Sequence, residues 1–382
     1  MISFYTKKDF LKGSLFFIAI TSILSLACRP AEAPVESQAL LSAIDLELED
    51  PDTLIADSLH TLIGVGDMML GTNYPAASYL PANGGKDLLS DVLDTLVQAD
   101  LTFGNLEGTI LNSGGTAKRC NNPSACYVFR SPESYVEHFS KAGFDLLSLA
   151  NNHSGDFGLT GRNRTKATLD EAGIAYAGLA GTDETAIIER NGIRYGFCAF
   201  APNSGTCDVR NLARAKAIVG SLVDKVDVII VSFHGGAEGS NHQHVTRKTE
   251  TYYRENRGNV YNFAHAVIDA GADVVFGHGP HVTRAMELYK DRLICYSLGN
   301  FCTYGRFNLR GVSGVAPIVQ LQINKEGAFR GGNIVPIYQM KTHGPKIDPQ
   351  KRAITLLRDL TKSDFPETAL EISEDGFLSK KQ

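Results

Sequence analysis

Short apolar runs alternate with segments of helical periodicity from about residue 59 to the end of the chain. Runs stopped by glycine or polar residues predict strands, and apolar residues three and four apart predict helices. The predicted strands are 60–66, 100–105, 144–150, 174–177, 226–233, 273–277, 315–323 and 331–340, with hairpins at 186–200 and 284–298. The predicted helices are 85–99, 132–143, 160–172, 211–225, 247–271 and 349–361. Strands that alternate with helices indicate a layered α/β domain.

The first residues follow another pattern. Three lysines precede an apolar stretch, residues 15–27, that is too short to span a bilayer comfortably, and small residues then lead to Cys28. This order predicts a secretory signal over residues 1–27. The end of the stretch, "SLAC", resembles a bacterial lipoprotein signal, in which the cysteine becomes the lipidated first residue. An uncleaved membrane anchor with an ordinary cysteine is the alternative. Either way we expect an extracytoplasmic protein held at a bacterial membrane of the cell envelope.

The domain organisation follows from these patterns. Residues 28–58 are rich in Pro, Ala and acidic residues and have no sustained period, which predicts a tether. Residues 59–343 are expected to form the folded domain, and residues 344–382 a C-terminal helix and tail.

Net charge limits the class of partner. The whole chain carries −5, and removal of a signal with three lysines and one aspartate leaves −7. Nucleic acids are held through basic surfaces, so a nucleic-acid partner is not expected.

The cysteines are arranged in close pairs. Of seven cysteines, lipidation of Cys28 leaves six, an even number in an oxidising compartment. The candidate disulfide cysteines are Cys120, Cys126, Cys198, Cys207, Cys295 and Cys302, and their connectivity is not fixed by the sequence. Cys120 and Cys126 lie in a polar loop where a disulfide is plausible, whereas Cys198 and Cys295 lie in apolar runs and could equally be buried thiols.

Polar side chains follow the predicted strands at the point where each strand ends. They are Asp67, Asn105, Glu107, Asn152, His153, Asp156, His234, Glu238, His278, His281 and Asn300. The carboxyl ends of strands in an α/β sheet converge on one crevice, so we expect these side chains to lie close together. Carboxylate, amide and imidazole groups form a mixed oxygen and nitrogen ligand set that suits Mn, Fe or Zn.

Each residue also has an ordinary structural interpretation. Asp67 could cap a helix, Asn and Gly after a strand are typical of turns, and Glu107 could pair with an arginine. His153 could be a hydrogen-bonded core histidine, and His242 and His244 lie in a polar loop that favours solvated or substrate-facing positions. The coincidence of five strand ends favours a site over these separate explanations.

The same segments resemble a known family. "GVGDMMLG", "ADLTFGNLEGTI", "GFDLLSLANNHSGDFG", "SFHGGAEG", "AGADVVFGHGPHV" and "CYSLGNF" are similar, in order and spacing, to the motifs of the CapA/PgsA-like family. That family is associated with bacterial capsule and poly-γ-glutamate synthesis. It is in turn similar to calcineurin-like metallophosphoesterases, which implies a four-layered α/β/β/α sandwich with a site for one or two divalent transition metal ions.

The resemblance implies roles for individual residues. Asp67 and Asn152 match metal ligands, and Asn105 or Glu107 would bridge two metals, with Glu107 favoured because a neutral amide bridges cations poorly. His234 and His278 would bind one metal and His281 the other. His153 matches the non-ligand histidine that contacts the substrate and acts in catalysis. Glu238, Asp156 and Asn300 are expected to contact ligands or substrate.

Two features depart from the metallophosphoesterase pattern. The first motif of those enzymes supplies Asp and His two residues apart, but Met68 and Met69 follow Asp67 here. The motif Gly-His-Gly-Pro-His, which ends at His281, has one more residue than the usual Gly-His-x-His.

The sequence is compatible with two functions. The first is a lipid-anchored, metal-dependent hydrolase that acts on an envelope phosphoester or on an anionic polymer such as poly-γ-glutamate. The second is a non-catalytic accessory protein that binds poly-γ-glutamate or a membrane-embedded capsule synthase. The retention of polar residues at nearly every strand end favours the hydrolase.

Overall fold

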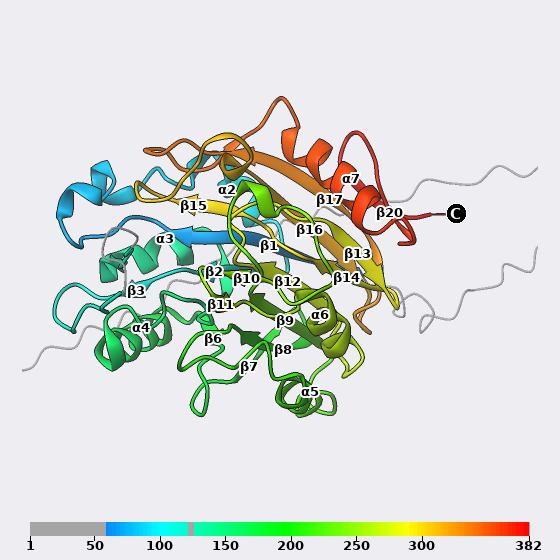
Figure 1. Cartoon of the computed structure of the whole chain (residues 1–382), viewed down its shortest axis with the longest axis horizontal. Coiled ribbons are helices and arrows are strands. Elements are labelled where there is room, and N and C mark those ends of the chain that lie inside the picture. Colours follow the sequence, from blue (N-terminus) through cyan, green and yellow to red (C-terminus); the bar gives the residue numbers. More distant parts are fainter. Residues whose placement is uncertain (1–58, 121–125, 382) are drawn as a thin grey trace, which may run out of the picture. The chain divides into compact units, whose positions relative to one another are not determined.

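Two β-sheets packed face to face form the centre of the folded part, and helices cover the outer face of each sheet (Figure 1). This computed structural model describes residues 59–120 and 126–381, all of which belong to one compact unit. The predicted signal, Cys28 and the predicted tether all lie outside the described residues. The predicted four-layered α/β/β/α sandwich is confirmed.

The larger sheet has ten strands, with parallel pairing around β1 and antiparallel pairing toward the C-terminal strands. In order across the sheet they are β19 (Leu370–Ile372), β20 (Phe377–Lys380), β17 (Phe329–Tyr338), β16 (Val315–Ile323), β1 (His60–Met69), β2 (Leu101–Leu106), β5 (Phe144–Ser148) and β6 (Ala175–Ala177), with β15 (Asn300–Thr303) beside β1 and β18 (Lys346–Ile347) beside β17. The residues after 343 thus contribute a helix and three short strands, which pair within this sheet.

The second sheet has six strands. In order they are β13 (Met286–Tyr289), β14 (Arg292–Cys295), β12 (Val274–His278), β9 (Val228–His234), β8 (Ile193–Phe200) and β7 (Thr185–Arg190). Two further two-stranded pairs join β3 (Thr109–Ile110) to β4 (Arg130–Ser131) and β10 (Thr251–Tyr252) to β11 (Glu255–Asn256). Strands β8, β9, β12 and β14 run parallel, so their carboxyl ends meet at one edge.

The main core fills the space between the two sheets. Phe103 of the large sheet stacks on Phe276 of the six-stranded sheet with ring centroids 5.2 Å apart. The outer faces are covered by α2 (Leu93–Leu96), α3 (Val136–Lys141) and α4 (Gly158–Ala172) on the large sheet, and by α5 (Leu212–Gly220) and α6 (Val260–Ile268) on the other. Helix α7 (Arg352–Asp364) contributes apolar residues to the core between the sheets. It also contributes to the apolar cluster between the six-stranded sheet and helices α5 and α6. Burial of these faces is the main force that stabilises the sandwich.

Two predicted helices are wrong in extent. The segment 85–99 forms only the 3₁₀ turn Ser90–Val92 and α2. The long helix 247–271 is replaced by the β10–β11 hairpin followed by α6. Tyr253 and Arg254 adopt positive φ angles of 45° and 68° and form the hairpin turn, which a helix cannot include. Helix α6 begins only at Val260, where the Asn259 side chain accepts a hydrogen bond from the Asn262 N–H.

The remaining helical segments are short 3₁₀ turns. They are η1 (Ala77–Tyr79), η2 (Ala82–Gly85), η3 (Ser90–Val92), η5 (Glu133–Tyr135), η6 (Ser240–His242) and η7 (Gly311–Gly314). No helix among the described residues is both long and apolar enough to cross a membrane.

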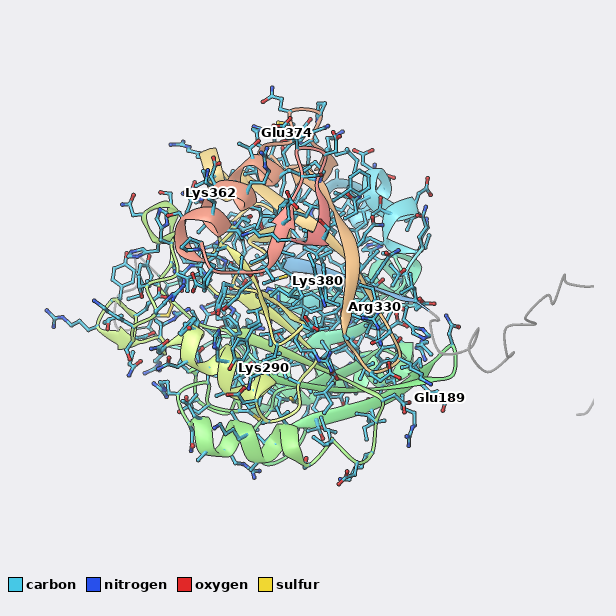
Figure 2. All side chains as sticks on the ribbon, turned by 90° about the vertical axis from the view of Figure 1, so that its right-hand side faces the viewer. Glu189, Lys290, Arg330, Lys362, Glu374 and Lys380 are labelled. Carbon is cyan, nitrogen blue, oxygen red and sulfur yellow. A yellow bond between two sulfur atoms is a disulfide. The ribbon has the colours of Figure 1, made fainter. Side chains whose placement is uncertain are left out.

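The two ends of the parallel strands differ in character. Glu189, Lys290 and Arg330 are exposed near the ends where these strands begin, on the side that Figure 2 shows. That side carries charges of both signs in contact with solvent. Buried polar side chains gather instead where the parallel strands finish.

One disulfide forms among the described cysteines. Cys120 and Cys126 are bonded, whereas Cys198, Cys207, Cys295 and Cys302 are buried free thiols. Burial raises the pKa of the Cys207 and Cys302 thiols to about 12, so they stay protonated and unreactive at neutral pH.

The disulfide is expected to stabilise the fold modestly. It joins cysteines six residues apart, and closing so short a loop contributes about 2 kcal/mol to the free energy of unfolding. Cys120→Ser should therefore lower that free energy by about this amount in denaturant titrations without reductant. Reductant should produce the same loss in the unmodified protein and none in the variant. An unchanged unfolding midpoint in Cys120→Ser would contradict the prediction.

Candidate metal centre

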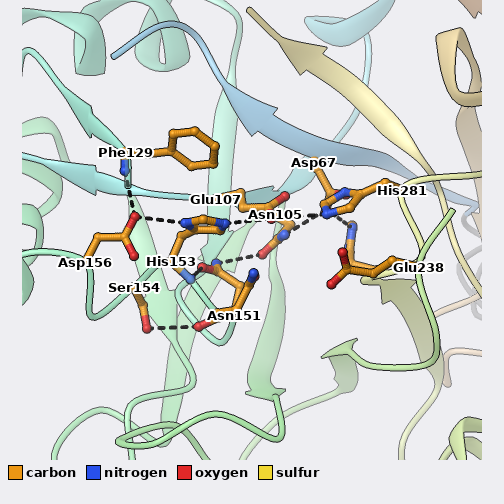
Figure 3. Close-up of polar contacts among 12 residues, drawn as sticks. Asp67, Asn105, Glu107, Phe129, Asn151, His153, Ser154, Asp156, Glu238 and His281 are labelled. Carbon is orange, nitrogen blue, oxygen red and sulfur yellow. Dashed lines mark hydrogen bonds and ion pairs between the residues drawn. The ribbon is translucent and has the colours of Figure 1, made fainter. Parts of the chain in front are cut away.

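Strand register brings the polar strand ends together. In the large sheet Asp67 lies opposite Asn105 on one side and Asn300 on the other. In the six-stranded sheet His278 lies opposite His234. Since the two sheets pack face to face, the ends of β1, β2, β9 and β12 supply residues to one site (Figure 3). The fold therefore brings these strand-end side chains close together, as the sequence predicts.

Local backbone geometry directs Asp67 into the site. The pairing of β1 shifts register at Asp67 on both sides, and such irregularities re-aim a side chain. The preceding residue must be glycine, because a Cβ on Gly66 would lie 2.1 Å from the Gly299 carbonyl oxygen. This close approach allows the Asp67 N–H to donate to that same oxygen over 2.9 Å.

The extra residue in the Gly-His-Gly-Pro-His motif is accommodated by two left-handed positions. Gly279 has φ +113°, and a Cβ there would lie 2.6 Å from the Gly235 carbonyl oxygen. His281 has φ 55°, which is unusual for a residue with a side chain. Strain of this kind persists where the surroundings enforce it. The turn brings His281 Nδ1 to 2.8 Å from Asp67 Oδ2.

The Asp67 carboxylate contacts several polar side chains of the site. Its Oδ1 accepts a hydrogen bond from Asn105 over 2.8 Å and lies 3.2 Å from His278 Nδ1. Burial would raise the pKa of Asp67, but the close approach of His278 and the hydrogen bond with His281 outweigh burial and hold the pKa well below its ordinary value. Asp67 is therefore a carboxylate, the form that binds a cation.

Glu107 and His234 are buried polar groups whose ligand atoms form no hydrogen bond among the described residues. Both are fully buried, and neither oxygen of Glu107 nor either nitrogen of His234 has a hydrogen-bond partner within residues 59–120 and 126–381. Burial raises the pKa of Glu107 well above its ordinary value and lowers that of His234. Orphaned groups of this kind are costly unless a ligand satisfies them.

The donor set fits a divalent cation. Ligand atoms of Asp67, Glu107 and His281 all lie within 4.8 Å of one another. Burial would lower the pKa of His281, but the charge of Glu107 and the hydrogen bond to Asp67 raise it to about 10. His281 lies between the carboxyl groups of Asp67 and Glu107, 2.8 Å and 3.5 Å away, so this position favours positive charge. Carboxylate and imidazole groups together match the preferences of Mn, Fe or Zn.

His153 lies on the other side of Glu107 from His281 (Figure 3). Its Nε2 is 3.8 Å from Glu107 Oε1, and its Nδ1 is 2.8 Å from Asp156 Oδ2. Asp156 is itself fixed by the Phe129 N–H and by Lys118, 2.6 Å and 2.5 Å away. Burial lowers the pKa of His153, although Asp156 acts in the opposite direction. A carboxylate on one ring nitrogen orients the other toward the site.

The three asparagines after β2 and β5 act differently. Asn105 donates to Asp67 and accepts from Asn151, so both ends of its amide bond protein groups. Asn151 also donates to the Leu106 carbonyl over 2.8 Å, which ties β2 to the loop after β5. The Asn152 Oδ1 is buried without a partner in the part of the chain that the structure describes. Asn152 and Glu107 thus retain free ligand atoms, and Asn105 does not.

A cavity of about 520 Å³ opens beside these residues. Asn152, His153, Glu238, His281 and Asn300 contribute to its wall. Asn300 donates to the carbonyl oxygens of His281 and Ser313 and leaves its Oδ1 without a partner among the described residues. His242 and His244 do not line the cavity, and His244 instead contacts Asp364 over 2.7 Å.

Several residues of the site were not found by sequence reasoning. Lys118 and Phe129 lie in the long loop after β3, and Phe307 lies after β15. Phe129 packs on the His153 ring with centroids 4.3 Å apart and also stacks on Phe307. Arg257 lies just after the β10–β11 hairpin, inside the segment predicted as helix. No local motif marks these positions.

The two methionines after Asp67 do not take the place of a nitrogen ligand. Met68 is part of the core under the large sheet. The Met69 sulfur accepts a hydrogen bond from the Gly71 N–H over 3.3 Å. Neither contributes to the ligand cluster around Asp67, so nitrogen ligands must come from other strands.

Comparison with known proteins gives a family match. Residues 61–304 match the family model described as bacterial capsule synthesis protein PGA_cap. A capsule biosynthesis protein CapA of Bacillus anthracis is 28% identical over 250 residues, which cover 63% of this chain and 59% of that protein. A PGA biosynthesis protein CapA of Bacillus subtilis is 26% identical over 347 residues, 85% of this chain and 83% of that protein. A probable polyglutamine synthesis accessory protein of Mycobacterium tuberculosis is 32% identical over 227 residues, 53% and 55% of the two chains.

The chain covers less than two thirds of the length of several curated relatives that it matches: 65% of the protein y4sH of Sinorhizobium fredii, 59% of the Bacillus anthracis protein and 55% of the Mycobacterium tuberculosis protein. Among solved structures, a putative 5'-nucleotidase from Staphylococcus aureus aligns with 79% of this chain and 58% of its own, at 15% identity and a TM-score of 0.46. We base no inference on a likeness at that score.

Proposed function

Because the chain belongs to the bacterial capsule synthesis protein family PGA_cap, we propose that it is a metal-dependent hydrolase acting in capsule or poly-γ-glutamate synthesis. One observation carries the hydrolase proposal. The buried oxygens of Glu107 and nitrogens of His234 lack hydrogen-bond partners in the described residues, and they lie beside an ionised Asp67. Buried groups of this kind are costly unless a ligand such as a cation satisfies them.

The chain's own residues would divide the work. Asp67, Glu107, His234, His278 and His281 would hold one or two divalent ions of Mn, Fe or Zn, with Asn152 as a further ligand. When bound, such ions supply Lewis-acid polarisation of the bond that is attacked. His153, oriented by Asp156, would hold the reacting oxygen of the substrate and move a proton at Nε2. Phe129 and Phe307 would exclude water from the His153 side of the cavity.

The proposed substrate is an envelope phosphoester or a linkage of an anionic polymer such as poly-γ-glutamate. The relatives named for capsule and PGA biosynthesis support the polymer context. The test is a panel of phosphomonoesters, phosphodiesters and γ-linked glutamate polymers, each incubated with the metal-loaded full chain. Turnover that disappears on chelation and returns with metal supports the proposal. Metal-loaded protein that turns over none of the panel contradicts it.

A non-catalytic accessory protein is the second candidate. The absence of a histidine two residues after Asp67 favours it, as does the similarity to a Mycobacterium tuberculosis protein described as a probable accessory protein of polyglutamine synthesis. In that case the cavity would bind poly-γ-glutamate or a membrane-embedded capsule synthase without turnover. Binding of the polymer with unchanged chain length would favour this candidate.

We also propose that Cys28 carries a lipid that anchors the protein outside the cytoplasm. Cys28→Ser should leave the chain unlipidated while the domain after residue 58 folds normally, because Cys28 is remote in sequence from the apolar residues that form the cores. The expected result is loss of the protein from membranes washed with carbonate. Unchanged retention after this wash would contradict the lipid anchor.

A further inference from the structure

Arg257 is a buried arginine on the wall of the cavity beside the candidate metal centre. The residue is 2% exposed, and it follows directly after β11. Its Nη1 lies 2.9 Å from Glu238 Oε1. Its Nε and Nη2 have no hydrogen-bond partner in residues 59–120 or 126–381. Glu238 therefore engages only Nη1 of the guanidinium, and the N–H donors of Nε and Nη2 are left for a ligand.

The two remaining donors form a fork. Nε and Nη2 lie on one edge of the planar guanidinium, where their N–H bonds run parallel and match two oxygens of a carboxylate or phosphoryl group. A purely structural ion pair with Glu238 would leave these buried donors unsatisfied, which is unfavourable for a charged group. The free edge instead fits an oxyanion.

The position of Arg257 is fixed by its backbone. Its N–H donates to the Glu250 carbonyl over 2.9 Å, and its own carbonyl accepts from the Gly236 N–H over 3.0 Å. Glu250 is held in turn by a buried two-point ion pair with Arg284, whose closest contacts are 2.8 Å and 2.9 Å. The guanidinium is thus carried by a braced segment, which preorganises it for a ligand.

Arg257 also lies close enough to act on the metal ligands electrostatically. Its charge lowers the pKa of Glu107 against the larger effect of burial, and it lowers the pKa of His234 in the same direction as burial. His153 and His281 line the same cavity. A ligand group that reaches the candidate metal centre therefore passes within range of this charge.

We propose that Arg257 binds an anionic oxygen group of the substrate, phosphoryl or carboxylate, through the fork formed by Nε and Nη2. This inference rests on the proposed function, since it assigns the substrate-binding role at the same site. It makes the ligand class an oxyanion rather than a neutral ester or a cation. Lys118 and Arg306, which also line the cavity, add positive charge around the same ligand.

The test measures anion affinity in the full chain, with and without bound metal. Inorganic phosphate and a short γ-linked glutamate oligomer are titrated calorimetrically into the unmodified protein, Arg257→Gln, Arg257→Lys and Arg310→Gln. Arg310 is exposed and lines a neighbouring cavity, so its replacement matches the change in net charge. We expect Arg257→Gln to weaken binding about 10- to 100-fold. Arg257→Lys should recover only part of this, because lysine keeps the charge but lacks the fork, and Arg310→Gln should bind like the unmodified protein.

Glu238→Gln separates direct contact from a structural role. This change releases the guanidinium from its competing carboxylate, so the affinity for the anion should stay equal or increase. A loss as large as that in Arg257→Gln would mean that both residues only hold the loop, and it would overturn the proposal. Unchanged affinity in a folded Arg257→Gln, or no anion binding by the unmodified protein, would overturn it as well.

Comparing phosphate with the glutamate oligomer identifies the anionic group that Arg257 binds. Measuring metal uptake tests the proposed hydrolase separately from the role of Arg257. Tighter binding of phosphate assigns a phosphoryl group, and tighter binding of the glutamate oligomer assigns a carboxylate. If the chain takes up no metal, the proposed hydrolase fails, while the comparison of Arg257→Gln with unmodified protein still decides the role of Arg257.

Discussion

His153→Ala is expected to lower hydrolytic turnover about 10²- to 10⁴-fold while the metal content stays near that of the unmodified protein. The Nε2 of His153 faces Glu107 from 3.8 Å, whereas its Nδ1 is engaged by Asp156. A histidine oriented in this way is suited to contact a reacting oxygen or to move a proton there. Metal content by elemental analysis and turnover on the best substrate of the panel measure the two effects separately.

Asp67→Ala and Asn152→Ala provide the comparison for His153→Ala. Both remove proposed ligands and should reduce metal content and turnover together. If His153→Ala removes the metal, His153 is a ligand and its assigned role is wrong. If the variant retains both metal and turnover, the catalytic role of His153 fails and the accessory protein becomes the better account.

His234→Ala is expected to remove at least one equivalent of metal. Both ring nitrogens of His234 are buried without a partner in the described residues, and β9 places the ring beside His278. Removing a ligand from such a site lowers metal affinity strongly, and at limiting metal this appears as lost occupancy. His278→Ala should behave in the same way. The measurement is metal content after dialysis against buffer without free metal.

His244→Ala is the matched control for the metal ligands. His244 is an exposed histidine that contacts Asp364 and does not line the cavity. Its replacement should leave metal content unchanged. Equal metal content in His234→Ala, His278→Ala and His244→Ala would contradict the assignment of the two buried histidines.

The site was largely predictable because its residues follow strands that the apolar pattern marks clearly. His234 and His278 each end a buried strand, Asp67 lies two residues before the end of another, and parallel strands bring their carboxyl ends to one edge. The sequence alone does not show that the Asn105 side-chain amide hydrogen-bonds to Asp67 and Asn151 and is therefore not free to bind a metal. That choice depends on pairing across β1, β2 and the loop after β5, which are far apart in the chain.

The β10–β11 hairpin and the position of Arg257 could not be predicted, because the local sequence favours a helix there. Residues 247–271 contain apolar residues at spacings that a helix would use, and only α6 realises them. The turn at Tyr253 and Arg254 contains neither glycine nor asparagine, although both residues take positive φ. Tertiary contacts, among them the ion pair of Arg257 with Glu238, override the local preference.

The antiparallel part of the large sheet was predicted only in outline. Strands β16 and β17 followed from their apolar runs, but β19 and β20 have few residues and exposed positions. β20 pairs with β17 and β19 pairs with β20, and their apolar residues pack with Ile354 and Leu357 of α7, a contact that their own sequence pattern does not reveal.

The central claim is that the buried strand ends bind metal, and the metal content of the purified full chain tests it most directly. The chain should contain one to two equivalents of Mn, Fe or Zn, or take them up on titration after chelation. The ligands are already gathered, with Asp67, Glu107 and His281 within 4.8 Å of one another. Protein that purifies without metal and binds none of the three ions on titration would contradict the account.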